Sequence, residues 1–319
     1  MYFSALDNSD PRINGRQYEI AYPVTGIQEI AARLGKLSGV TSELEITTAW
    51  DYAPPIPRGI DPQVDMATQN GTSSVPFQYV PWLTGMWQRL DLAISRDSVM
   101  LDFGCGVGEC VDQFRQTGFN AYGCDIVFPK EPDARLKTHL APGTIRQIQS
   151  EPYRIPFDDD MFDVVLSFQV FEHVMDYDPV LAEIQRILKP GGVSVHVFPG
   201  RWRVIEGHTF VPFASVLKAY WWLYLWALLG IRNEYAAGLS ANETARRYSN
   251  WLKEHTNYLS RTQIREYVSK YFSDCRFAAE RDFYPAHARL FNRFPFLLPI
   301  YRMWYSETEM RVLVFGKDK

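Results

Sequence analysis

The chain has 319 residues, 46% of them hydrophobic and 15% aromatic, and a formal net charge of -4 at pH 7. This length suits one large domain with additions, and the lack of a long Lys/Arg run argues against a nucleic-acid partner. The 4 cysteines show no metal-ligand spacing, which predicts reduced thiols. No basic segment followed by an apolar stretch opens the chain, so no signal peptide is expected and a cytoplasmic location is predicted.

Residues 1–95 are predicted to form an N-terminal helical extension or cap. Residues 27–37 have helical spacing, and the proline-rich segment 52–62 is typical of an extended linker. An aromatic helix is predicted over Gln78–Ala93, and core packing is its simplest role.

From Val99 onward, strand and helix patterns alternate, which predicts a doubly wound α/β fold with a parallel sheet. A core at 96–200 is expected to be followed by an insert at 201–258 and by a return to the sheet at 259–319. The expected strands are Val99–Phe103, Asn120–Asp125, Thr144–Gln149, Phe162–Phe168, Gly192–Phe198, Arg276–Tyr284 and Met310–Phe315, and the clearest helices are Glu109–Gln116, Pro179–Leu188 and Leu259–Phe272.

A glycine loop follows the first of these strands. Its pattern, G-x-G-x-G at Gly104, Gly106 and Gly108, lets the backbone turn sharply and approach a ligand closely. Dinucleotide enzymes instead require G-x-G-x-x-G. Here Glu109 takes the place of their third glycine, and its carboxylate would repel a pyrophosphate. Asp102, inside the strand, is a second departure from the dinucleotide pattern.

Asp125 ends the second predicted strand. An acidic side chain at this place can accept hydrogen bonds from both ribose hydroxyls. Nicotinamide enzymes share the feature, so it indicates a nucleoside without choosing its class.

Three further segments decide between the classes. Glu151–Ser167 reads EPYRIPFDDDMFDVVLS, Phe171–Val174 reads FEHV, and Glu183–Gly192 reads EIQRILKPGG. Together with the glycine loop, and in this order, they resemble the motifs of class I S-adenosylmethionine (SAM) methyltransferases that act on small molecules. The resemblance covers about Val99–Phe198.

The resemblance implies a Rossmann-like sheet of seven strands, six parallel and one antiparallel, with SAM as cofactor. In this family an aromatic helix like the predicted one at Gln78–Ala93 covers the cofactor. Two positions depart from the motif, because Glu151 stands where the family often has Asp, and Pro152 replaces a small residue. The implied roles are the methionine part of SAM for Asp102, Gly104, Cys105 and Gly106, the ribose and adenine for Asp125, Ile126, Glu151 and Pro152, and the sulfonium side for Phe168 and Gln169.

Two histidines are candidate catalytic residues. His208 lies just beyond the fifth predicted strand, where ligands bind in open α/β sheets, and could take a proton from an acceptor hydroxyl. Bonding to a backbone carbonyl is its alternative role. His173 occurs in family members with unrelated substrates, which favours an architectural role over acid–base or metal chemistry. A related quinone-methylating subgroup carries a further Glu upstream of this motif, where a metal could bind. This chain has Gln169 at that place, so no metal is predicted.

An aromatic insert separates the fifth strand from the helix near Leu259. Its segment Ala219–Ile231 carries no charge, and thirteen residues are too few to span a bilayer. It is interpreted as a buried roof over the site, or else as a hydrophobic lid for an apolar substrate or a peripheral membrane contact. A second apolar run at 290–305 is expected either to pack against it or to form a homodimer interface.

The predicted function is SAM-dependent methyl transfer to a hydroxyl of a small or lipid-like molecule. N- or C-methylation of a metabolite or saccharide remains the alternative within the class. Two rivals come from outside it: a nicotinamide enzyme, which would bind NAD and not SAM, and a non-catalytic scaffold, which would bind SAM without turnover.

Overall fold

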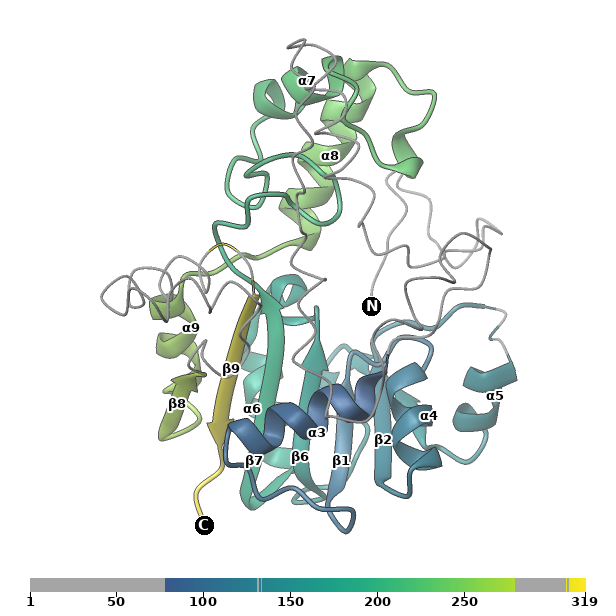
Figure 1. Ribbon diagram of the computed structural model, residues 1–319, viewed down its shortest axis with the longest axis vertical. Coiled ribbons are helices and arrows are strands. Elements are labelled where there is room, and N and C mark those ends of the chain that lie inside the picture. The colour runs from purple at the N-terminus through teal and green to yellow at the C-terminus, as the bar shows by residue number, and fades with distance from the viewer. Residues whose placement is uncertain (1–77, 131, 133, 279–307, 309) are drawn as a thin grey trace, which may run out of the picture.

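A computed structural model describes residues 78–130, 132, 134–278, 308 and 310–319. The patterns noted at 27–37, 52–62 and 290–305 lie outside the described residues. Within them, one seven-stranded sheet lies between two layers of helices that cover its two faces (Figure 1).

The sheet has the strand order β3-β2-β1-β6-β7-β9-β8. The pairs from β3 to β7 are parallel, and β9 runs antiparallel to both of its neighbours. The prediction of six parallel strands and one antiparallel strand is therefore confirmed. The strands are β1 (Val99–Phe103), β2 (Asn120–Asp125), β3 (Ile145–Gln147), β6 (Phe162–Phe168), β7 (Leu188–Pro199), β8 (Asp274–Phe277) and β9 (Met310–Gly316).

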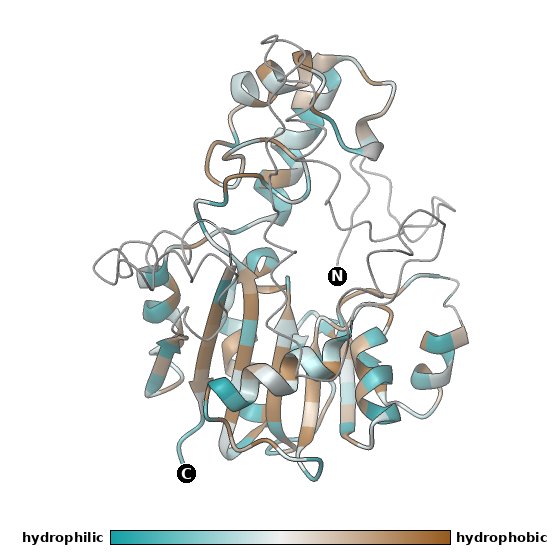
Figure 2. Ribbon diagram, viewed as in Figure 1, coloured by the Kyte–Doolittle hydropathy of each residue, from teal (hydrophilic) through white to brown (hydrophobic). Residues whose placement is uncertain are grey.

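Side chains of the central strands alternate between two apolar cores. Along β1, Met100 packs on one side of the sheet, and Leu101 and Phe103 pack on the other. Because both faces are covered, the central strands are almost continuously hydrophobic (Figure 2). One face is covered by α3 (Tyr79–Arg89), α4 (Glu109–Gln116) and α5 (Ala134–Leu140), and the other by α6 (Tyr177–Ile187) and α9 (Arg261–Val268).

Two segments differ from the expected elements. β7 starts at Leu188 rather than Gly192, because Leu188 already pairs with Phe162 and an irregularity in the register absorbs the residues that follow. The strand expected at Thr144–Gln149 ends as β3 at Gln147. The chain then forms a separate hairpin of β4 (Gln149–Ser150) and β5 (Tyr153–Arg154).

A third apolar cluster lies outside the sheet, in the insert after β7. It joins α7 (Tyr220–Leu228) to α8 (Ala241–His255). Helix α7 lies within the uncharged segment Ala219–Ile231, which was expected to be helical, whereas α8 was not expected. A capping box between Ser240 and Glu243 starts α8. The two helices stand beyond the carboxyl ends of the parallel strands (Figure 1). Among the described residues, no helix is long and apolar enough to cross a membrane.

Candidate functional site

The glycine loop is held tightly against the end of β2. The amides of Gly104 and Cys105 both donate to the Cys124 carbonyl, at 2.8 and 3.0 Å. Gly104 has a φ of +79°, and a Cβ built on it would meet Val170 Cγ2 at 2.4 Å. Only glycine fits this position, where the loop passes directly beneath the segment after β6.

The start of α4 is unsuited to an anion. Glu109 and Asp112 lie in its first turn, and their carboxylates offset the positive end of the helix dipole. This arrangement disfavours a pyrophosphate at the loop, in agreement with the departure from the dinucleotide pattern.

Asp125 connects the end of β2 to the loop. Its Oδ2 accepts a hydrogen bond from the Gly106 amide at 2.8 Å, and its Oδ1 accepts one from the Ile126 amide at 2.7 Å. The carboxylate is buried, yet it lines a cavity. The backbone thus fixes the orientation of this carboxylate at the wall of the cavity.

A cavity of about 640 Å³ opens at the carboxyl ends of the parallel strands. This volume lies in the range of small-molecule sites. Its wall runs from Gly104 and Asp125 to His173, Glu254 and His255. The site therefore joins the glycine loop to the last turn of α8, two regions far apart in the sequence.

Five of the twelve predicted site residues line this cavity: Gly104, Asp125, Ile126, Gln169 and His173. The others are not among the lining residues: Asp102, Cys105, Gly106, Glu151, Pro152, Phe168 and His208.

The residues that do not line the cavity occupy different surroundings. Glu151 and Pro152 form the exposed turn of the β4–β5 hairpin. Phe168 packs against Tyr79 and Trp82 of α3, with ring centroids 5.8 and 5.1 Å apart. The aromatic helix thus has the core-packing role considered for it.

Asp102 lies buried within β1. Burial raises the pKa of its carboxyl to about 7, and the nearby Asp125 adds to the shift. A cationic ligand group close to the loop would reverse this cost, because it favours the ionised form.

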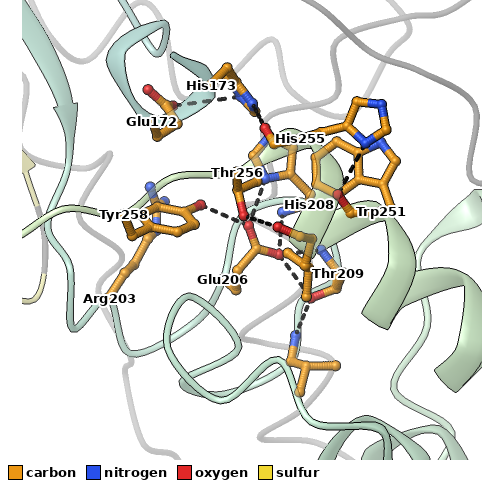
Figure 3. A network of polar contacts seen from close by, with 12 residues as sticks. Glu172, His173, Arg203, Glu206, His208, Thr209, Trp251, His255, Thr256 and Tyr258 are labelled. Carbon is orange, nitrogen blue, oxygen red and sulfur yellow. Dashed lines mark hydrogen bonds and ion pairs between the residues drawn. The ribbon is translucent and has the colours of Figure 1, made fainter. Parts of the chain in front are cut away.

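The buried Glu206 pairs with the half-buried His208 in the insert (Figure 3). His208 Nδ1 lies 2.6 Å from Glu206 Oε1, and Tyr258 donates to the same oxygen at 2.9 Å. Thr209 donates to the other oxygen through its amide and hydroxyl. Burial opposes ionisation, but the charge of His208 and these hydrogen bonds outweigh it, and the pKa of Glu206 falls to about 2.

His173 lies between this pair and the cavity. Its ring meets that of His208 edge to face, with centroids 4.9 Å apart. Its Nδ1 donates to the His255 carbonyl at 2.7 Å, which leaves the lone pair on Nε2. Burial, followed by the charge of His208, lowers the pKa of His173 to about 3. The imidazole is therefore neutral at physiological pH.

Glu172 is a buried carboxyl beside His173. Neither of its oxygens has a hydrogen-bond partner among the described residues, and Oε1 lies 4.0 Å from His173 Nε2. Burial raises the pKa of Glu172 to about 7. In the described part of the chain, no three His, Cys, Asp or Glu side chains gather as a metal site.

The raised pKa of Glu172 makes its contribution to stability depend on pH. The folded state favours the protonated acid, so this contribution is complete below pH 4.5 and is lost as pH rises through about 7. Glu172→Gln should remove that loss. Its free energy of unfolding relative to wild type should rise by about 3 kcal/mol between pH 4.5 and pH 8. Urea unfolding at both pH values, with Glu266→Gln as the exposed control, measures this, and parallel curves for Glu172→Gln and wild type would contradict it.

The family comparison matches the site to known proteins. Residues 101–196 match a family model described as "Methyltransferase domain". This segment contains the glycine loop, Asp125 and His173. It is a class I SAM-dependent methyltransferase domain. SAM is the cofactor of this domain, and the buried acids and the tight loop fit a cationic nucleoside better than a dinucleotide.

Curated relatives of the methyltransferase domain transfer methyl groups to different atoms. A ubiquinone/menaquinone biosynthesis C-methyltransferase from Idiomarina loihiensis is 30% identical over 118 residues, 34% of this chain and 46% of its own length. A ubiquinone biosynthesis O-methyltransferase from Roseobacter denitrificans is 31% identical, over 30% of this chain and 39% of its own length. Norajmaline N-methyltransferase from Rauvolfia serpentina is 32% identical, over 30% and 34%. The chain spans about a third to a half of the length of these relatives.

A solved structure with a related arrangement is Haemonchus contortus phosphoethanolamine N-methyltransferase 2 in complex with SAM. It is 16% identical, with a TM-score of 0.42 over 75% of this chain and 53% of that chain.

Part of the cavity wall near the glycine loop was not predicted from the sequence. Glu254 comes from α8, which was not predicted although the pattern Ser240-x-x-Glu243 signals its start. Tyr153 and Asp176 also line the cavity, and no motif marks either of them. His255 also lines the cavity, whereas the nearby Trp251 and Tyr258 do not.

Proposed function

We propose that the chain transfers the methyl group of SAM to a hydroxyl of a small, lipid-like molecule. Residues 96–200 would hold the cofactor, and 201–258 would cover the acceptor. The observation that carries the proposal is one continuous cavity, which joins Gly104 and Asp125 to the neutral imidazole of His173. The relatives named for ubiquinone biosynthesis support a lipid-like acceptor.

The cofactor supplies an activated methyl group on a sulfonium, and the chain supplies its binding site. Asp125 accepts hydrogen bonds from the ribose hydroxyls, and Ile126 packs against the adenine. Asp102 favours the ammonium of the methionine part through its charge. Glu151 and Pro152 stay as proposals for the adenine edge, Cys105 and Gly106 for the methionine side, and Phe168 and Gln169 for the sulfonium side.

The acceptor hydroxyl must lose a proton as it is methylated. His173 lines the cavity and offers an unprotonated Nε2, because the bond of its Nδ1 to the His255 carbonyl fixes the tautomer. The ionised Glu206 behind it raises the pKa of His173 against the larger effect of burial. His208 holds that carboxylate in place through the contact of its Nδ1 with Glu206 Oε1. His173 thus receives the proton, and the negative charge of Glu206 favours it there against the opposing charge of His208.

The charge of the cavity wall restricts the acceptor. Asp125, Asp176 and Glu254 contribute carboxylates, and no Lys or Arg is among the described residues that line it. Arg201 and Arg203, just beyond β7, donate hydrogen bonds to Gln263 and to the Ile205 carbonyl. An anionic acceptor would meet like charges, so we expect one that is neutral or cationic.

Three catechols of similar size test both the reaction and the charge rule. With labelled SAM, 4-ethylcatechol and dopamine should be O-methylated with kcat/KM at least about tenfold above that of 3,4-dihydroxyphenylacetate, since like charges in a partly enclosed site cost about 1.4 kcal/mol or more. Mass spectrometry and NMR identify the methylated atom. Glu254→Gln should narrow the difference in kcat/KM between the anionic catechol and the other two. A preference for the anion would refute the charge rule, and methylation at carbon or nitrogen alone would refute the hydroxyl acceptor.

A further inference from the structure

Helix α7 is apolar on every side, although only one side faces the protein. Leu223 and Ala227 are fully buried in the cluster shared with α8. The indole of Trp222 donates to the Pro212 carbonyl at 2.7 Å, which fixes the helix about its own axis. The opposite side chains therefore cannot turn inward without breaking this packing.

The outward side consists of large apolar residues at helical spacing. Trp221 is 62% exposed, Leu228 59% and Leu225 44%, and Tyr220 and Leu229 flank them at similar exposure. Positions 221, 225 and 228 lie on one face of a helix. We call these five residues the α7 outer face. No charged residue occurs between Ala219 and Ile231.

The position of α7 suits contact with a flat surface. The helix stands at one end of the long axis of the molecule, the end opposite to the sheet (Figure 1). A helix that is hydrophobic all round is normally buried. With nine residues, α7 is too short to cross a bilayer, but it can lie in the interface with its outer side chains among the lipids.

The size of the α7 outer face argues against a second copy of the chain. Five side chains at about half exposure offer on the order of 500 Å², whereas a stable interface takes about 800 Å² from each partner. Trp and Tyr next to Leu are the residues that favour the boundary between water and lipid. We propose that the α7 outer face docks the protein on the surface of a lipid bilayer, independently of which acceptor it methylates.

Because the α7 outer face carries no charge, its contact with a bilayer should depend on apolar burial rather than on attraction to charged lipids. Binding that rests on apolar burial persists on uncharged lipids and at high salt, whereas attraction to anionic lipids is screened by salt. The proposal therefore predicts similar binding to phosphatidylcholine vesicles and to vesicles that also contain phosphatidylglycerol.

Vesicle flotation of the full chain tests the proposal. Wild type should float with both kinds of vesicle, in low and high salt. Trp221→Glu with Leu225→Glu should lower the partition coefficient at least about a hundredfold, because each large apolar side chain contributes roughly tenfold or more. Leu228→Gln should lower it about tenfold. Trp202→Glu changes a similarly exposed tryptophan outside α7 and should leave it unchanged.

Unchanged SAM binding and an unchanged melting temperature confirm that the variants are folded. Because flotation does not require methyl transfer, its outcome is independent of the proposed function. The proposal would be overturned if the wild-type protein did not float with the vesicles, or if the double variant floated as wild type does. Binding only to the anionic vesicles would overturn it as well. Light scattering that shows a dimer lost in the double variant would assign the α7 outer face to a subunit interface instead.

Discussion

Replacing Asp125 with alanine is expected to weaken SAM binding at least a hundredfold. The buried carboxylate supplies charge-assisted hydrogen bonds to the ribose hydroxyls, each worth about 1.5–3 kcal/mol. It also holds the amides of Gly106 and Ile126 at 2.8 and 2.7 Å, so its loss frees the glycine loop from the end of β2. Isothermal titration with SAM measures the effect.

Two further variants make the result specific to the ribose contact. Asp125→Asn keeps an oxygen for the loop amides but loses the charge, so its affinity should lie between those of alanine and wild type. Asp97→Ala, on the exposed turn before β1, should bind SAM as wild type does. An affinity of Asp125→Ala within threefold of wild type would show that the nucleoside lies elsewhere.

His173→Asn is expected to lower kcat by roughly 10² to 10⁴, the usual contribution of a general base. The asparagine amide can still donate to the His255 carbonyl, as Nδ1 does now, so the packing of α8 is kept. What the variant loses is the Nε2 lone pair. The Kd for SAM should stay within about threefold. Steady-state methylation of 4-ethylcatechol measures kcat, and single-turnover kinetics measure the methyl-transfer step apart from product release.

The matched change at the second histidine separates their roles. His208→Asn keeps a donor for Glu206 and should lower kcat only about tenfold, since His208 acts on the proton only by positioning the Glu206 carboxylate. If His208→Asn proves the more damaging, the base is His208 and His173 only positions it. Full activity in both variants would place the proton acceptor outside this network.

Much of the fold could be predicted because its signals are local. The bounds of β1, β2, β6 and α4 agree with the expected ones, since buried parallel strands form short apolar runs and the glycine loop separates the first strand from its helix. The meeting of Gly104 with Asp125 also follows from the sequence, because the carboxyl ends of adjacent parallel strands share one edge.

The rest of the site depends on packing between distant segments. His173 was given an architectural role, and only the contact between α8 and the segment after β6 brings its ring to the cavity wall. Nothing in the sequence indicates that both carboxyl oxygens of Glu172 are buried without hydrogen-bond partners among the described residues. The exposed turn at Glu151 arises from pairing of β4 with β5, two-residue strands too short to show a pattern.

The place of β9 in the sheet has a consequence for biosynthesis. This strand lies between β7 and β8, although the ribosome makes its residues, Met310–Gly316, after all other strands of the sheet. Until they emerge, β7 offers an open edge to any neighbouring nascent chain, and β8 has no partner in the sheet. Completion of the sheet must therefore await the synthesis of residues 310–316, which makes the interval before it the period of greatest need for a chaperone.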